Sequence, residues 1–147
     1  MFIGQNLGAQ RIDRVKDAIR LAFRFTLIFQ LALYALIFLL SPVIAAQFSD
    51  EINVQETIIL YLKIVPLSYG VSGIIILINV AMNVLSKPRI ALYINVIRLL
   101  FLYLPLAYFG SRMYGLNGFY IGITIGHFLA YILALIWFNK VLQEIDN

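Results

Sequence analysis

The sequence predicts an all-α, polytopic membrane protein with four transmembrane helices. Three observations support this fold class. The chain of 147 residues is 63% hydrophobic and only 12% charged, whereas a soluble domain is about half apolar and about a quarter charged. Its mean hydropathy is +0.93. Its basic residues gather at the ends of long apolar segments, as they do in the cytoplasmic loops of membrane proteins.

The composition argues against several other classes of protein. The chain has no cysteine, which excludes disulfides, thiolate metal sites and cysteine nucleophiles, and its single histidine is too few for a histidine-based metal cluster. No set of residues pairs a nucleophile with a base, so we expect neither an enzyme nor a cofactor. The net charge of +4 comes from basic residues that lie mostly at the ends of the apolar segments, as expected for the loops of a membrane protein. The expected partner is therefore the lipid bilayer, and nucleic acid is not expected.

The chain begins with a basic lead over residues 1–17, which we expect to be cytoplasmic, and a first span over about 18–48. The uncharged run from Phe25 to Ser49 is far longer than the apolar part of a signal peptide, which is about 7–15 residues, so we expect a retained helix. Pro42 is expected to end or kink this helix near its outer end. The polar stretch that follows has acidic but no basic residues, which indicates an outer loop.

A second span is predicted over about 56–84. Pro66, Gly70 and Gly73 predict that this helix is bent or locally irregular. Such breaks are tolerated in a membrane where protein or a cavity covers the freed backbone groups. The basic turn at 86–89 then indicates an inner loop.

A third span is predicted over about 90–110 and a fourth over about 118–139, with a short outer turn between them. All of the 11 basic residues except Lys63, Arg98 and Arg112 fall on the inner side of this topology. The positive-inside rule therefore places both termini in the cytoplasm of a multi-pass protein of the cell membrane.

The basic lead resembles the cytoplasmic-loop motif of the multidrug and toxic compound extrusion (MATE) transporters. The matching residues are Gly4, Gln5, Asn6, Leu7, Gly8, Ala9, Arg11 and Arg14. Later stretches resemble the same family in order and spacing: Ser86-Lys87-Pro88-Arg89 with Arg98, Leu104-Pro105-Leu106-Ala107, and Gly115-Leu116-Asn117-Gly118. Together these stretches resemble the last four of the family's twelve helices.

This resemblance implies a secondary multidrug exporter, an antiporter of small organic substrates driven by a sodium ion or a proton. Family members have two six-helix lobes, and the substrate crosses between them. The chain would then be a single membrane domain, an incomplete C-terminal lobe that needs the missing N-terminal helices and is not active alone. The family's coupling acids have no counterpart in the spans of this sequence, so no coupling residue is assigned.

Arg98 is the strongest candidate for contact with a substrate, because it is a charged residue inside a predicted span. It lies about 12 Å into a hydrocarbon core that is about 30 Å thick. An arginine there costs about 2.5 kcal/mol or more unless it pairs, faces water or reaches the interface. It is therefore either a cavity-facing cation that meets a substrate anion or a carboxylate of the missing helices, or a residue that snorkels or caps a carbonyl. The sequence leaves both interpretations open.

The other polar residues of the spans favour structural roles. Lys63 has a stem long enough to reach the outer headgroups. Asn79 and Asn83 lie four residues apart and are expected to bond a neighbouring helix more readily than a substrate. His127 could relay protons, but a single hydrogen bond to another helix is the favoured role.

A stripe of small residues follows the last predicted helix at intervals of four residues. Its members are Gly118, Gly122, Gly126, Ala130 and Ala134. Small residues at this spacing let two helices approach closely, so we expect a packing seam, within the chain or between two copies.

Two alternative functions remain open at this point. One is a flippase for anionic lipid-linked sugars of the same superfamily, which the basic residues Lys63 and Arg98 favour. The other is a small non-transporting membrane protein that associates through its glycine stripe.

Overall fold

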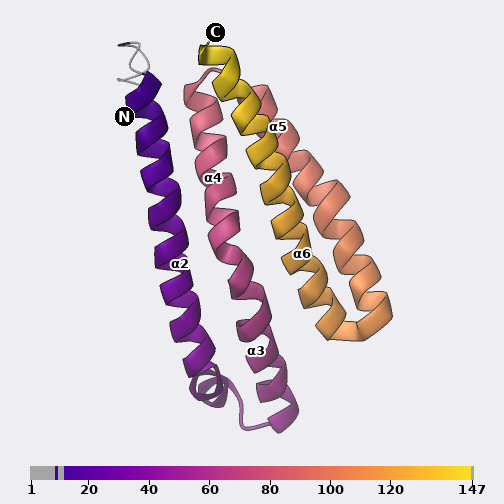
Figure 1. Cartoon of the computed structure of the whole chain (residues 1–147). Helices are drawn as coiled ribbons and strands as arrows, with labels where there is room; N and C mark the ends of the chain where they lie inside the picture. The colour runs from indigo at the N-terminus through magenta and orange to yellow at the C-terminus, as the bar shows by residue number, and fades with distance from the viewer. Residues whose placement is uncertain (1–8, 10–11, 147) are drawn as a thin grey trace.

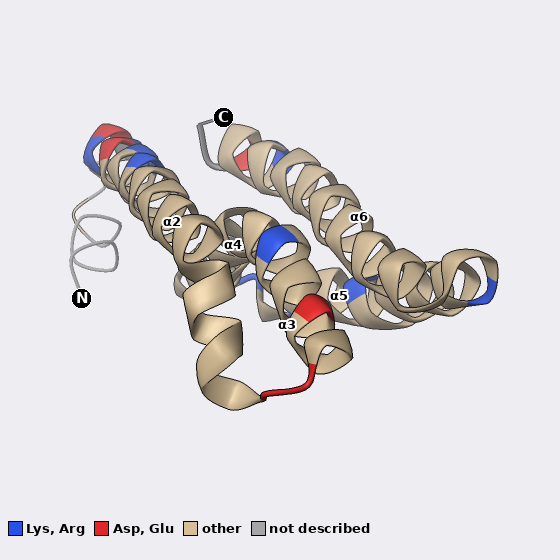
Figure 2. Cartoon of the chain, turned by 90° about the horizontal axis from the view of Figure 1, so that it is seen from below, with Lys and Arg blue, Asp and Glu red and all other residues tan. Residues whose placement is uncertain are grey.

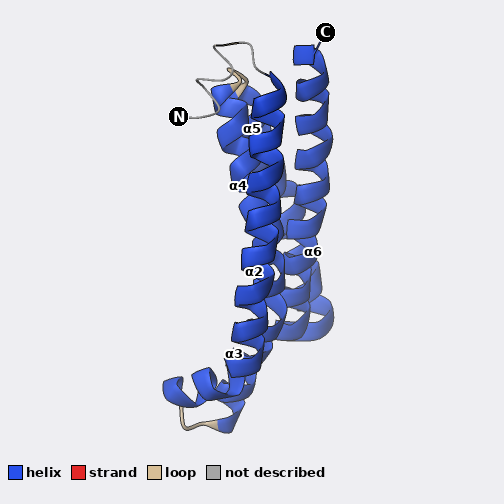
Figure 3. Ribbon diagram, turned by 60° about the vertical axis from the view of Figure 1, so that its left-hand side comes forward, coloured by secondary structure: helices blue, strands red, loops and turns tan. Residues whose placement is uncertain are grey.

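The computed structural model describes Ala9 and residues 12–146, and its elements are all helical. In chain order they are α2 (Ile12–Phe48), α3 (Ile52–Ile64), the 3-10 turn η1 (Val65–Ser68), α4 (Tyr69–Val84), α5 (Pro88–Val96), the π-helical segment η2 (Ile97–Tyr103) and α6 (Leu104–Asp146). They run up and down side by side in one elongated bundle (Figures 1 and 3). No strand occurs in the described part of the chain.

Three helical stretches of the described residues are long and apolar enough to cross a membrane. They are Asp13–Phe48, Ile52–Val84 and Pro88–Glu144. The predicted all-helical, multi-pass class is thereby confirmed. The last stretch contains two of the predicted spans, and its division depends on the geometry within α6.

The chain reverses direction inside α6, at Tyr114 and Gly115. Tyr114 has φ −135° and ψ 19°, and Gly115 has φ 60° and ψ −138°, neither of which is helical. A backbone like that of Gly115 is accessible to glycine and to almost no other residue. Figure 1 shows the ribbon turning back at this point, so that the two arms of α6 lie side by side.

The first helix begins at Ile12, earlier than the predicted start of the span at about residue 18. Asp13 lies in its first turn, where a carboxylate interacts well with the helix dipole. Arg20 and Asp17 form an exposed ion pair at 3.2 Å, one turn apart. The end of the basic lead is therefore helical. Pro42 lies inside α2, and the last turns of the helix bend away from its main axis (Figures 1 and 3).

The predicted irregularity at Pro66 is present as the 3-10 turn η1. Proline has no N–H to donate to the preceding turn, so carbonyl groups near it need other partners. The Tyr34 hydroxyl of α2 donates to the Lys63 carbonyl at 2.8 Å, and the Thr124 hydroxyl of α6 donates to the Ile64 carbonyl at 3.4 Å. Two neighbouring helices thus satisfy the backbone at the break.

The helix α4 occupies the centre of the bundle. Its side chains Ile74, Ile75, Ile78 and Met82 are completely buried against α2, α5 and α6. By contrast α2 presents a mostly exposed apolar face. Residues with charges of both signs gather on the first turns of α2 and near the end of α6 (Figure 2). At that same end, Lys87 of the α4–α5 turn pairs with Glu144 at 3.0 Å.

Candidate functional site

Arg98 lies in the π-helical segment η2, about midway along the helix that starts at Pro88. In a π turn the N–H of one residue donates to the carbonyl of the fifth residue before it, as the Leu104 N–H donates to the Leu99 carbonyl here. Such turns are rare in proteins, and those that do occur are often found at functional sites. The Arg98 side chain is half-buried, and its guanidinium carbon lies 5.6 Å from the centre of the Tyr103 ring.

Tyr103 connects Arg98 to His127 of α6. The Tyr103 and His127 rings are 4.4 Å apart at their centroids, with an interplanar angle of 59°. The Tyr103 hydroxyl oxygen is buried and makes no well-formed hydrogen bond with another described residue, although the Ser72 side chain lies near it. A buried hydroxyl in this state has unused capacity to donate and accept.

The hydrogen bonds around His127 define which of its nitrogens carries the proton. Nδ1 lies 3.1 Å from Ser68 Oγ and 3.1 Å from the Ile123 carbonyl oxygen. A carbonyl can only accept, and Ser68 Oγ already donates to the Val65 carbonyl at 2.8 Å. Both contacts therefore require a proton on Nδ1. In the neutral ring this leaves Nε2 as an acceptor.

We call Ser68, Arg98, Tyr103 and His127 the Arg98 cluster. Its members come from η1, η2 and α6, so three separate helical stretches must pack together to form it. The break at Pro66 places the Ser68 hydroxyl against His127, and the π segment carries both Arg98 and Tyr103. The cluster offers a cation, a buried hydroxyl and an imidazole, a combination suited to an anionic or strongly polar ligand.

Lys63 is not part of this cluster. Its side chain is exposed and turns toward α2, with Nζ 5.4 Å from the centre of the Phe38 ring. Among the described residues the acids lie near the start of α2, from the α2–α3 loop to the start of α3, or near the end of α6. Neither Lys63 nor Arg98 forms an ion pair with any of them.

The two asparagines of α4 are placed differently. Asn79 is half-buried, and its Nδ2 donates to Oδ1 of Asn95 on α5 at 3.3 Å. Asn95 in turn donates to the Ala91 carbonyl at 2.8 Å. Asn83 is exposed. Sequence reasoning did not single out Asn95, Ser68 or Tyr103, because none carries a charge or a recognisable spacing signal.

The three glycines of the small-residue stripe lie against the other arm of the reversal at Gly115, and its alanines, Ala130 and Ala134, belong to the buried core. All five of its members are buried. A Cβ added to Gly118 would overlap the Gly110 carbonyl, and one added to Gly122 would overlap the Leu106 carbonyl. At Gly126 the nearest atom would be Tyr103 Cδ1, at 3.0 Å. Close packing along the stripe therefore places the Tyr103 ring against Gly126, and Tyr103 in turn contacts Arg98 and His127.

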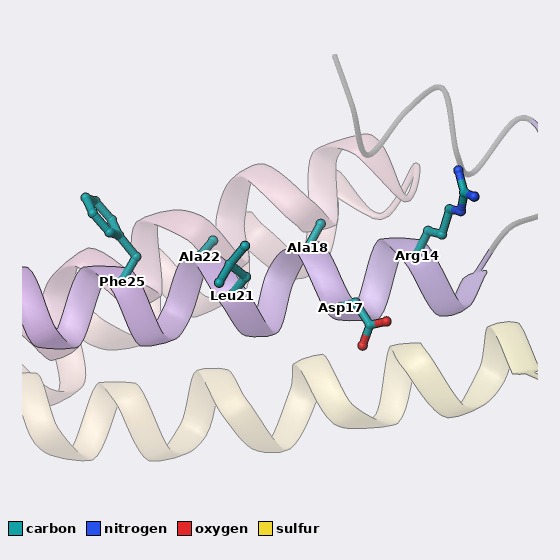
Figure 4. Close-up of a pocket in the computed structure, with 6 residues that line it drawn as sticks. All are labelled: Arg14, Asp17, Ala18, Leu21, Ala22 and Phe25. Carbon is teal, nitrogen blue, oxygen red and sulfur yellow. The ribbon is translucent and has the colours of Figure 1, made fainter.

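Most of the glycine-rich loop motif lies outside the described residues, including Gly4, Gln5, Asn6 and Gly8. Ala9 is exposed in a turn, and Arg14 is exposed on α2. Arg14 lines an open hollow of about 790 Å³ together with residues of the same helix (Figure 4). Among the described residues, no group of three His, Cys, Asp or Glu side chains could hold a metal ion.

A bundle of long apolar helices with a polar cluster between them is typical of a polytopic membrane protein, a class that includes transporters. The family model MatE matches residues 1–109, so the chain belongs to the MatE family. The chain is 34% identical over 144 residues to a protein of Shewanella oneidensis called FAD transporter, a match that covers 98% of this chain and 32% of that protein.

Solved structures agree with this assignment. The Vibrio cholerae MATE transporter VcmN in its bent form has a TM-score of 0.93 and 33% identity, and the match covers 99% of this chain and 33% of that one. An inward-facing multidrug resistance MATE family transporter of the MOP superfamily has a TM-score of 0.90 at 21% identity, over 98% of this chain and 34% of that one, and shows the fold alone. The chain thus spans about a third of the length of these relatives.

Proposed function

We propose that this chain forms one side of the substrate path of a MATE-type secondary transporter, driven by a sodium or proton gradient. Membership of the family and 33–34% identity over nearly the whole chain to transporters support the class. The proposal includes an opposing set of helices as partner, because transporters of this kind move one repeat against another around a central site.

The proposed topology has four spans, with both termini on the cytoplasmic side of the cell membrane. The reversal at Tyr114 and Gly115 supports it, because it divides the longest apolar stretch into two arms. The start of α2, the α4–α5 turn and the end of α6 lie at one end of the bundle (Figure 1). These three places carry most of the basic residues, as cytoplasmic ends do.

The observation that carries the substrate proposal is the Arg98 cluster. A half-buried guanidinium without an ion-pair partner in the described residues is costly inside a membrane, and a negative charge brought by a ligand would offset that cost. The half-buried Arg98 guanidinium beside the Tyr103 ring suits an anionic molecule that carries a planar ring system. A flavin dinucleotide has this chemistry, and the Shewanella oneidensis relative is called an FAD transporter. We therefore propose an organic anion of this class as substrate.

Multidrug efflux is the second candidate. The name of one structurally similar protein includes multidrug resistance, and the loop motif of the lead resembles multidrug exporters. A cationic drug would need an acid deep in the membrane, and the acids of the described spans all lie near the ends of those spans, so the opposing helices would have to provide it. A lipid-linked sugar flippase and a non-transporting protein are not favoured, because the comparisons match MATE transporters along almost the whole chain.

Transport in inverted membrane vesicles tests these proposals. The chain is co-expressed with the part of the Shewanella oneidensis relative that it does not match, and uptake of FAD and of a cationic dye is measured with and without an ion gradient. Arg98→Ala is expected to lower FAD uptake at least tenfold, the change that about 1.4 kcal/mol of lost binding would give.

Arg112 provides a matched control for this measurement. Its guanidinium carbon also lies 5.6 Å from a tyrosine ring, that of Tyr108, but the residue is exposed near the reversal of α6. Arg112→Ala should leave uptake unchanged. Dye uptake that survives Arg98→Ala, without FAD uptake by the parent, would favour multidrug efflux. Equal losses in both arginine variants would contradict a role for the cluster.

A further inference from the structure

A groove of about 270 Å³ lies between α2 and α6, at the end of the bundle where α2 begins and α6 ends. Its polar lining consists of Lys16 and Arg20 from α2 and Asn139 from α6, with no acidic residue among the residues that line it. Lys16 and Arg20 are four residues apart, so they project from the same face of the helix. The mouth of the groove therefore carries two basic side chains, of which Arg20 also pairs with Asp17 at 3.2 Å.

The rest of the groove is apolar and runs toward the middle of the bundle. Phe23 forms one wall, and Leu135 and Phe138 form the other. The Phe23 and Phe138 rings are 6.1 Å apart at their centroids, so the two walls of the groove touch there. The groove thus changes from cationic to hydrocarbon-like along the direction in which a lipid changes from headgroup to acyl chain.

The position of the groove matches the level of the membrane interface. Arg24 is the last charged residue before Asp50, so the hydrocarbon region begins near Arg24, one helical turn past Arg20 on α2. On α6, Trp137 is half-buried beside the groove residue Phe138, and tryptophan is enriched at membrane interfaces. Phosphate groups of the inner leaflet would lie at this level.

We propose that this groove binds an anionic phospholipid, with its phosphate at Lys16 and Arg20 and one acyl chain along Phe23, Leu135 and Phe138. Basic pockets between helices on the cytoplasmic side are known to hold acidic headgroups. Arg20 also pairs with Asp17 in the exposed position described above, but a guanidinium has five donors and an ammonium three. Each cation can therefore contact a phosphate and keep a protein partner.

This site goes beyond transport of a substrate. A lipid in the groove would connect the peripheral helix α2 to α6, and it would do so without contact with the Arg98 cluster. The proposal of lipid binding and the proposal of FAD transport can therefore be refuted separately.

Fluorescence of Trp137 tests the proposal, because it is the only tryptophan of the chain and it precedes the groove residue Phe138 in sequence. The full chain is placed in bilayers of phosphatidylcholine, in which either the phosphatidylcholine or a small fraction of added phosphatidylglycerol carries brominated acyl chains. Bromine quenches tryptophan on contact. Stronger quenching by the phosphatidylglycerol than its mole fraction predicts would measure a preference for the anionic lipid.

The double variant Lys16→Gln/Arg20→Gln is expected to lose this preference, by about fivefold for each cation removed. The control Arg89→Gln/Lys140→Gln removes the same charge from exposed residues at the same end that do not line the groove, and it should keep the preference. Helical circular dichroism checks that both variants are folded.

Three results would overturn the proposal. The first is quenching that follows mole fraction in the parent. The second is an equal loss of preference in both double variants, which would indicate general surface charge. The third is relief of quenching by inorganic phosphate or glycerol phosphate at low concentration, which would identify a free anion as the ligand.

Discussion

Substitution along the glycine seam gives a graded prediction of stability. At Gly122 an added Cβ would overlap the Leu106 carbonyl, which belongs to helical backbone and cannot move alone. Gly122→Ala must therefore push the two arms of α6 apart, and overpacking of this kind costs about 1–3 kcal/mol. Gly122→Leu is expected to reach or exceed the upper end of that range, because a leucine holds the two backbones further apart.

Gly126 differs from Gly122 in the neighbour that an added Cβ would meet. That neighbour is Tyr103 Cδ1 at 3.0 Å, the edge of a side chain that can shift by a few tenths of an ångström. Alanine also has a helix propensity about 1 kcal/mol better than glycine. The two effects nearly cancel, so Gly126→Ala should change the free energy of unfolding by less than about 1 kcal/mol.

The assay is reversible unfolding in mixed micelles of a mild detergent and dodecyl sulfate, followed by circular dichroism. Ile123→Leu serves as control, because it conserves volume and lies off the stripe. The expected order of stability is parent, Ile123→Leu and Gly126→Ala together, then Gly122→Ala, then Gly122→Leu. If Gly122→Ala were as stable as Ile123→Leu, the seam would not hold the arms together as described.

Further predictions concern topology, the helix break, the surface ion pair and activity. Cysteines placed singly at Asn53 and Ser86 should react with impermeant reagents from the outer and the cytoplasmic side respectively, and the reverse pattern would refute the proposed orientation. Tyr34→Phe should lower the free energy of unfolding by about 1 kcal/mol in the same micelle assay, because it leaves a carbonyl at the break unsatisfied; no change would mean that the bond is not formed. Lys87→Gln should cost less than about 1 kcal/mol, and high salt should remove the difference, since both partners are exposed. The 147-residue chain alone should give no gradient-driven uptake in inverted vesicles, and uptake abolished by Arg98→Ala in that preparation would show that the chain builds the whole path itself.

The sequence was sufficient for features that depend on local chemistry. Long apolar runs predict helices of membrane length, and Pro66 predicts an interrupted helix because its missing N–H acts on its own turn. The reversal near Gly115 could be expected from the polar and glycine content between the last two segments.

The candidate site could be predicted only in part. Arg98 was found because a charge in an apolar segment is visible in sequence. Tyr103 and Ser68 acquire their roles from neighbours far along the chain, and no local pattern distinguishes this tyrosine from the others. The π-helical segment from Ile97 to Tyr103 also has no signature in composition, because its residues would fit an α-helix equally well.

The reversal at Gly115 has a consequence for the order in which the protein assembles. The contacts of Gly110 with Gly118, and of Leu106 with Gly122, join residues close in sequence, so the two arms can pair with little loss of chain entropy. They can do so as soon as both have left the ribosome and entered the bilayer, without waiting for any other helix. Arg98 and Tyr103 would then be presented on a finished hairpin, and the docking of Ser68 from the earlier broken helix would be the last step that completes their surroundings.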